Sequence, residues 1–388
     1  MIKIKPYTEL PQKDEIFNLY LYLVSKSMPF YPEDVFPEGF YFPDGKTKTN
    51  LICYNRQSRR RTDAYKSILN DNDYKEHIIP NEATIEERKK NDALLAEAII
   101  KKYSKELHNY LYRNMKDGHV NPSSLRQILK LSVSYNALQK LPFVSDALKA
   151  NDKEKENILK HVFRYEAFSA QKEIYHLVSL MGVEICPYCN RLFVTTVSEE
   201  KKKMRPQLDH YRSKSQYPFL ALSILNLVPC CGVCNHIKGD NTSEILYPYE
   251  EEMGNQCYFS VDAKHDLTVL TGARINHEEL TIDFKLPKEE SPLKQHIQSS
   301  IELLNLKEVY QSHRRYVSDM LLQRYIFTDE MVRDIKNSFP TLFKTEEEVR
   351  ELLLLNKLDP DHLGDRPLGK LTHDILDELD FLYEKSKE

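Results

Sequence analysis

The sequence predicts a mainly α-helical protein that contains a compact cysteine-rich segment near its centre and a small β-containing segment after it. Glycine is scarce, with ten copies among 388 residues, and tryptophan is absent. Long stretches also lack proline, which is typical of a helical chain with few tight turns. A chain of this length can form two or three domains, each with its own hydrophobic core.

The first half of the chain is expected to contain two of these domains. Residues 1–83 are rich in proline, tyrosine and phenylalanine, and a single helix is expected there, from Asp14 to Ser27. A helical domain is expected over residues 84–180, where Thr84 and Glu87 form a capping box. Its apolar residues recur at helical spacing and are interpreted as packing between helices. They include Leu95, Ile99, Tyr103, Leu107, Ile158, Val162 and Tyr165.

Two CxxC pairs define the central segment. Cys186 and Cys189 form the first pair, and Cys231 and Cys234 form the second. Two such pairs, far apart in sequence, are typical of a structural zinc site. The reason is that Zn²⁺ prefers thiolate sulfur and accepts tetrahedral geometry without a ligand-field penalty. The cysteines therefore predict a Zn²⁺ ion that holds a small fold together.

Three other cysteines are expected to lie outside this site. Cys230 adjoins the second pair but lacks the two-residue spacing, so it is expected to be a buried neighbour, while Cys53 and Cys257 have no partner at ligand spacing. The start of the chain has neither the pattern of a signal peptide nor an apolar run long enough to span a bilayer, so a cytoplasmic location is expected. Reduced cytosolic thiols favour metal binding over disulfides.

Residues with a different chemistry lie between and after the two pairs. Asp209 and His210 are adjacent, and Asn226 and Asn235 follow them. An imidazole with a pKa of ~6.5 can accept a proton from water near neutral pH, and carboxylate and amide oxygens suit Mg²⁺. Hydrolysis of a phosphodiester needs a base of this kind and a hard cation. The segment therefore predicts two metals, Zn²⁺ on sulfur and Mg²⁺ or Mn²⁺ on oxygen.

This combination of residues resembles the HNH endonucleases, also called His-Me finger or ββα-metal nucleases. The matching positions are Asp209, His210, Asn226, Cys234, Asn235 and Lys238. The resemblance implies a zinc-stabilised ββα-metal finger in residues 181–250. Its strands are expected at Leu192 to Val197 and Arg205 to His210, and its helix from Asn235 onward.

The resemblance also assigns roles within this finger. His210 would be the general base, and Asp209 and Asn235 would bind the catalytic Mg²⁺ or Mn²⁺ ion. Asn226 would brace the loop and orient the His210 ring through its other nitrogen, and Lys238 would contact a phosphate. The last metal ligand stays open in the sequence, because a register shifted by one residue would replace Asn235 with its neighbour in the chain, His236.

A nucleic-acid footprint on this protein would have to be local. The formal net charge is −4, which excludes a generally basic coat protein. Basic residues beside the motif are expected to contact phosphates, because each neutralised phosphate releases counterions. The candidates are Lys203, Arg212, Lys214 and Lys238, with Lys201, Lys202 and Arg205 in the same clusters and a separate run of Arg56, Arg59, Arg60 and Arg61.

The remaining residues, 251–388, are expected to form strands and then helices. Strand-like segments are Cys257 to Val261, Leu267 to Leu270 and Leu280 to Phe284. Helices are expected to resume near Pro292, with a long helix through Val309, Tyr316 and Leu321 and a last one from Leu368 to Tyr383.

The order of these regions is similar to that of bacterial antiphage-defence effectors of the Septu and retron-associated HNH type. The segments that carry this likeness are Leu208 to Ser215 and Asn226 to Pro229, although Ser213 stands where those effectors commonly have proline. The resemblance implies a DNA substrate and a separate ATPase partner, since this chain has no GxxxxGK[ST] motif. Cleavage of RNA or tRNA is an alternative, and a non-catalytic zinc-stabilised module that binds nucleic acid or protein is another.

Overall fold

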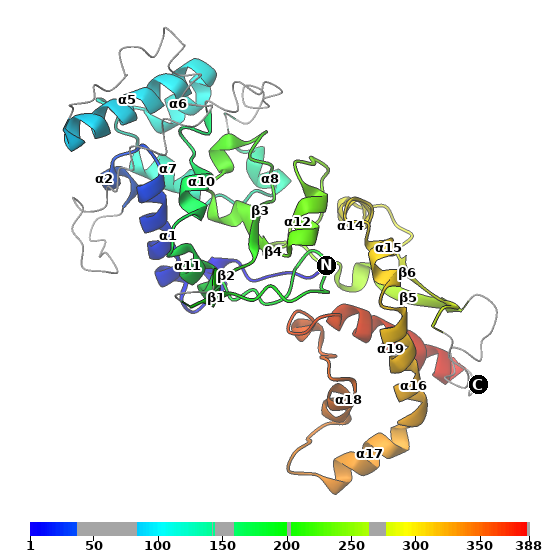
Figure 1. The fold of residues 1–388 in the computed structure, drawn as a ribbon. Helices are drawn as coiled ribbons and strands as arrows, with labels where there is room; N and C mark the ends of the chain where they lie inside the picture. Colours follow the sequence, from blue (N-terminus) through cyan, green and yellow to red (C-terminus); the bar gives the residue numbers. More distant parts are fainter. Residues whose placement is uncertain (37–83, 142, 144–158, 200–202, 264–276, 386–388) are drawn as a thin grey trace.

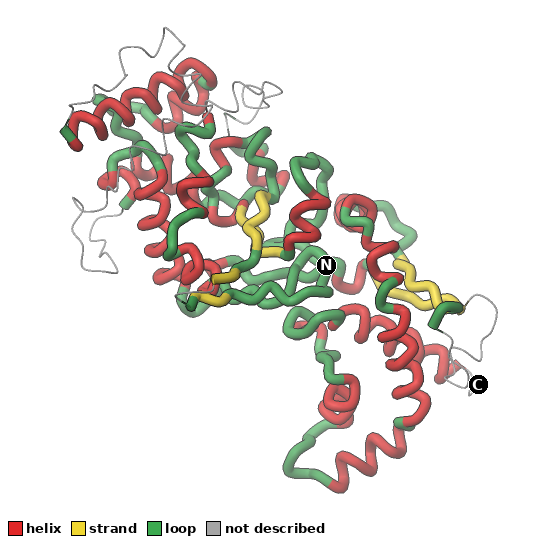
Figure 2. Tube along the Cα trace, viewed as in Figure 1, coloured by secondary structure: helices red, strands yellow, loops and turns green. Residues whose placement is uncertain are grey.

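The computed structural model describes residues 1–36, 84–141, 143, 159–199, 203–263 and 277–385. Within these residues helices predominate and the three β-sheets have two strands each, which confirms the mainly α prediction (Figure 2). No helix in this part of the chain is both long and apolar enough to cross a membrane. Cys53, the arginine run at 56–61, Ile158, Lys201, Lys202 and the expected strand at 267–270 lie outside the described residues.

A helical lobe forms the first half of the described chain, blue to green in Figure 1. The predicted first helix is confirmed as α1 (Lys13–Ser27), which packs against α10 (Tyr165–Ser169) and α11 (Ile174–Leu180). The capping box at Thr84 is also confirmed, because its hydroxyl accepts the Glu87 backbone N–H at 3.2 Å. The other helices of this lobe are α2 (Pro32–Val35), α5 (Ile85–Tyr103), α6 (Lys105–Leu111), α7 (Pro122–Leu129) and α8 (Tyr135–Leu138).

An antiparallel hairpin and a short helix follow in the centre of the molecule. Strand β3 (Gln207–His210) pairs with β4 (Leu227–Cys230), with Asp209 opposite Val228. Helix α12 (Gly232–Lys238) begins directly after β4 and ends at Gly239, whose φ of 49° favours glycine at a helix end. The order along the chain is thus strand, strand, helix.

Two predicted elements of this region are wrong in detail. Leu192 to Val197 is not the expected first strand, because it folds back over the first CxxC pair. Its backbone bonds to that pair, with Cys186 N–H donating to Leu192 O at 2.9 Å. Phe193 makes only an isolated bridge with Ile185, and the first strand pair is β1 (Val197–Ser198) with β2 (Lys203–Met204). The helix starts at Gly232, three residues before the predicted start, because the Cys231 sulfur caps it.

The last part of the described chain forms a second lobe, yellow to red in Figure 1. The expected strands at 257–261 and 280–284 correspond to β5 (Tyr258–Ala263) and β6 (Leu280–Lys285), and the last helix is α19 (Gly369–Lys385). The helix expected to run through Val309 and Leu321 is interrupted after Gln311, where the Ser312 hydroxyl donates to Val309 O at 2.7 Å. The remaining helices are α14 (Pro292–Leu303), α15 (Leu306–Gln311), α16 (Arg314–Ile326), α17 (Asp329–Ser338) and α18 (Glu346–Leu354).

The first CxxC pair lies where the two lobes meet. Tyr310 of α15 donates its hydroxyl hydrogen to Cys189 O at 2.6 Å. Asn190 follows this pair with a positive φ of 50°, and its backbone carbonyl accepts the Leu368 N–H at 2.6 Å. Buried apolar residues of both lobes form one continuous core around this junction. The core and these bonds hold the central hairpin in a fixed position.

Candidate metal centre and catalytic site

The structure brings together the four cysteines that the sequence singled out. The sulfurs of Cys186, Cys189, Cys231 and Cys234 all lie within 4.8 Å of one another and are buried. Four sulfurs at the corners of a tetrahedral zinc site, with Zn–S bonds of about 2.3 Å, are about 3.8 Å apart. The cluster could therefore hold a metal such as zinc.

Backbone N–H groups donate hydrogen bonds to sulfurs of this cluster. The Cys231 N–H donates to the Cys186 sulfur, and the Cys234 N–H donates to the Cys231 sulfur, each at 3.4 Å. Hydrogen bonds among the four thiols lower the pKa of Cys189 and Cys231, whereas burial raises the pKa of Cys186 and hydrogen bonds from its neighbours raise that of Cys234. A metal would have to displace the remaining thiol protons, because the thiolate is the ligand. Cys230 and Cys257 are buried and lie outside the cluster, as predicted.

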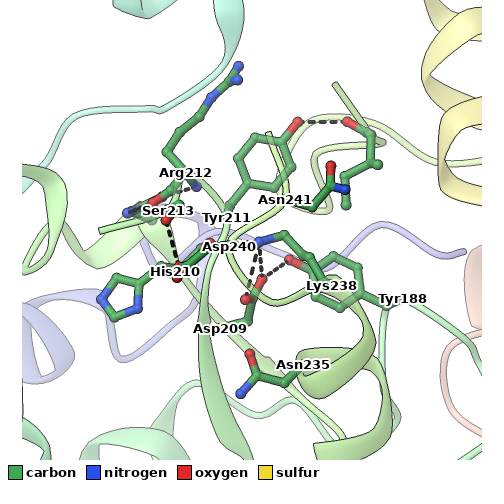
Figure 3. A network of polar contacts seen from close by, with 12 residues as sticks. Tyr188, Asp209, His210, Tyr211, Arg212, Ser213, Asn235, Lys238, Asp240 and Asn241 are labelled. Carbon is green, nitrogen blue, oxygen red and sulfur yellow. Dashed lines mark hydrogen bonds and ion pairs between the residues drawn. The ribbon is translucent and has the colours of Figure 1, made fainter. Parts of the chain in front are cut away.

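Asp209 and His210 point to opposite faces of β3, as consecutive residues of a strand do (Figure 3). The His210 ring nitrogen Nε2 lies 3.0 Å from Ala221 O. A carbonyl oxygen can only accept a hydrogen, so Nε2 carries the proton and Nδ1 keeps a lone pair. Burial, together with the nearby Lys214 ammonium, lowers the pKa of His210 to about 4. The imidazole is therefore neutral and able to act as a base.

Asp209 lies in a buried network with a tyrosine and a lysine (Figure 3). Its carboxylate accepts a hydrogen bond from the Tyr188 hydroxyl at 2.6 Å and forms an ion pair with Lys238 Nζ at 3.1 Å. The Lys238 ammonium also donates to His210 O at 2.8 Å. Burial raises the pKa of Asp209, whereas Lys238 and Tyr188 oppose that rise. This network ties α12 to the end of β3.

The position of Lys238 corrects its predicted role as a phosphate contact. Its side chain is only 2% exposed, because the ammonium is directed inward to Asp209. The same contact bears on the expected magnesium site, since a divalent cation beside Asp209 would lie against this ammonium. The oxygen donors are of the right type, but the arrangement does not fit Mg²⁺ while Lys238 is in place.

Replacing Lys238 by methionine is expected to destabilise the protein by about 3–5 kcal/mol, because Asp209 would be left as a buried, unpaired charge. Urea denaturation measures this loss. Adding Asp209→Asn to Lys238→Met removes the stranded charge and should restore part of the stability. A single Lys238→Met variant that is as stable as the wild type would show that the pair makes no net contribution.

Asn226 holds the loop after β3, which agrees with the bracing role expected of it. It is fully buried, and its amide nitrogen donates to Arg212 O and Leu220 O, both at 3.0 Å. Its oxygen accepts the Arg212 N–H at 2.7 Å. The residue after Leu220 is Ala221, whose carbonyl binds His210, so Asn226 acts on the His210 ring through the loop and not by direct contact.

The two alternatives for the last metal ligand are placed differently on α12. Asn235 faces β3, where its amide nitrogen donates to Gln207 Oε1 at 2.6 Å. His236 is exposed on the helix surface. The side of α12 that faces the Asp209 strand therefore carries Asn235.

The other predicted phosphate contacts near the hairpin fall into two groups, one buried and one exposed or partly exposed. The structure corrects the predicted role of Arg212 as a phosphate contact, because its guanidinium is buried. It donates to Val133 O at 3.0 Å and to the Glu244 carboxylate. Lys214 is partly exposed and pairs with Glu166 at 2.8 Å. Lys203 is exposed on β2 beside the Tyr175 ring. Lys203 and Lys214 therefore stay candidates for contact with an anionic ligand.

Two tyrosines of the site were missed at the sequence level. Tyr165 lies edge-on to His210, with ring centroids 4.3 Å apart, and its hydroxyl donates to Leu208 O at 3.2 Å. Its helical spacing with Val162 had been interpreted only as core packing. Tyr188 lies between the first two cysteines, and no pattern in the sequence linked it to Asp209.

Comparisons of this chain with protein-family models, with curated proteins and with solved structures found no match. The chemistry of the site is therefore the basis for assigning a function.

Proposed function

We propose that this protein is a phosphodiester-cleaving endonuclease of the HNH type. The observation that carries the proposal is the placement of a neutral histidine at the end of the first strand of a strand–strand–helix unit. The Nε2–H group of His210 donates a hydrogen bond to Ala221 O, so the lone pair of Nδ1 is available to take a proton. The adjacent four-cysteine cluster supports the proposal, because it would fix the start of α12 against the hairpin.

In the proposed reaction, His210 Nδ1 removes a proton from a water molecule, and the resulting hydroxide attacks phosphorus in line with the departing 3′ oxygen. The bond between phosphorus and the 3′ oxygen breaks, the departing oxygen takes a proton from a second water molecule, and the products are a 5′-phosphate and a 3′-hydroxyl. The Nε2 contact with Ala221 O keeps the ring oriented while the proton is transferred. A hard cation, if bound, would neutralise charge on the phosphate and on the leaving oxygen.

DNA is the proposed substrate, with RNA or tRNA as the alternative. The exposed Lys203 and the partly exposed Lys214 suit any phosphate backbone and do not select the sugar. The substrate is identified by incubating the purified protein with plasmid, linear and single-stranded DNA and with total RNA. By its resemblance to defence effectors, the protein is proposed to work with a separate ATPase, which co-purification would test.

A second candidate is a non-catalytic zinc-stabilised module that binds nucleic acid or protein. The ion pair between Asp209 and Lys238 favours this candidate, because it occupies a carboxylate that the nuclease reading assigns to a metal. Absence of cleavage on every nucleic acid, together with measurable binding, would select the module over the nuclease.

Brief treatment with EDTA is expected to stop cleavage and to leave zinc bound. Lys238 is too buried to neutralise charge on a substrate, so an exchangeable Mg²⁺ or Mn²⁺ ion would have to supply it. Such an ion could use Asp209 and Asn235 only after the Lys238 ammonium had moved away from the Asp209 carboxylate. A zinc ion on four thiolates is held far more tightly. Cleavage rate and zinc content are measured before and after chelation, and again after adding Mg²⁺. Full-rate cleavage by the stripped protein would rule out the magnesium hypothesis.

A further inference from the structure

We infer that Tyr165 is a positioning residue for His210, so that the helical lobe supplies a part of the catalytic site that the hairpin lacks. The inference rests on the proposed function, since it concerns the base of that reaction. Tyr165 is the first residue of α10 and lies well before the cysteine segment in the chain. It acts on His210 through the packing of its ring, and its hydroxyl adds a contact with the strand that carries the histidine.

The ring contact is the first support. The Tyr165 and His210 rings meet edge to face, with an interplanar angle of 73° and centroids 4.3 Å apart. This geometry is the favoured one for aromatic pairs, because the positive ring edge meets the negative ring face. The Ala221 carbonyl holds one nitrogen of the His210 ring by a hydrogen bond. The Tyr165 ring packs against the imidazole and restricts its rotation further.

The hydroxyl contact is the second support. Tyr165 donates to Leu208 O at 3.2 Å, two residues before His210 in β3. On the other side of His210, the Lys214 ammonium lies 4.9 Å from the centre of the Tyr165 ring and pairs with Glu166 at 2.8 Å. Helix α10 therefore contacts the chain before and after the base, and its own place is set by packing against α1.

Two substitutions at Tyr165 separate these contacts. Tyr165→Leu removes the ring, and we expect kcat to fall ~10–100-fold with little change in KM, because a misplaced base loses its alignment with the attacking water. Tyr165→Phe keeps the ring and removes only the hydroxyl, so its kcat should stay within about threefold of the wild type. This rescue by phenylalanine assigns the effect to ring packing.

Phe168→Leu is the matched control for a purely structural effect. Phe168 is fully buried on the same helix and packs against Tyr165, and its described ring contacts are with Tyr20 and Tyr165, not with His210. It should lower the melting temperature and leave kcat within about threefold. An equal loss of kcat in Phe168→Leu and Tyr165→Leu would overturn the inference, because general loosening of α10 would then explain both.

A measurement that does not depend on cleavage tests the inference separately from the proposed function. In full-length protein with ¹⁵N-labelled histidine, the signal of His210 is assigned by its loss in His210→Gln. A single Nε2–H tautomer is expected in the wild type, and averaging between tautomers in Tyr165→Leu. If the wild type cleaves nothing, the nuclease proposal fails while this spectrum still tests the ring contact. An unchanged spectrum in Tyr165→Leu would overturn the inference.

Discussion

Replacing His210 by alanine is expected to lower the cleavage rate by about 10²–10⁴-fold while the fold stays intact, because the variant loses the group that we propose takes the proton from water. Its ring contacts only Tyr165 and Ala221 O among the interactions described, so its removal leaves the cysteine cluster and the Asp209 network in place. Cleavage is measured under single-turnover conditions, and zinc content and the urea midpoint report on the fold.

The chain offers a matched control for this experiment. Asp361 and His362 form a second Asp-His pair, which lies in the second lobe with an exposed histidine bonded to Asp365 at 2.9 Å. His362→Ala should cleave at the wild-type rate. Wild-type activity in His210→Ala would remove His210 from the catalytic role and, with it, the main support for the nuclease proposal.

The cysteine cluster could be predicted from the sequence because its geometry is encoded by spacing. A CxxC turn brings two sulfurs together whatever surrounds it, and two such pairs close on a shared ion. Both pairs meet in the structure, and Cys230 is excluded from the cluster as its spacing predicted. The same holds for α1 and for the capping box at Thr84, which depend on neighbouring residues.

The strands of the hairpin were harder to predict because they depend on contacts between distant segments. Leu192 to Val197 is apolar and β-branched enough to form a strand, but its backbone groups are used to close the first CxxC turn. The actual partner of β3 is β4, which begins just after Asn226 and had been noted only as part of a motif. Tertiary contacts decided which segment paired.

The positions of the charged side chains were also hard to predict, because they too depend on contacts with distant segments. Lys238 and Arg212 are basic residues in the same segment of the sequence as Asp209 and His210, and the sequence alone gives both the same expected role on the surface. In the structure Lys238 is buried by its ion pair with Asp209, and Arg212 by its contacts with Val133 and Glu244. Lys214 and Lys203 differ from them only in the partners that the fold provides. Burial of a cation depends on such partners, which are distant in sequence.

Replacing Cys189 by serine is expected to have the largest effect on stability. Zinc on a thiolate site contributes about 10–16 kcal/mol in small zinc fingers, which is comparable to the total stability of a typical domain, about 5–15 kcal/mol. A serine oxygen is a poor replacement for sulfur as a zinc ligand. The loss should extend beyond the cluster, because Cys189 O also accepts the Tyr310 hydroxyl of the second lobe.

The test of this expectation uses Cys230→Ala as its control, since Cys230 is equally buried and adjoins the second pair but lies outside the cluster. The wild type and Cys230→Ala should each hold one zinc per chain by elemental analysis, and Cys230→Ala should lose only about 1 kcal/mol for its small cavity. Cys189→Ser should hold little zinc, and its central region should unfold or aggregate. A wild type that contains no zinc, or a Cys189→Ser variant as stable as Cys230→Ala, would show that packing alone maintains the fold, because the four sulfurs would then have come together without a metal to hold them.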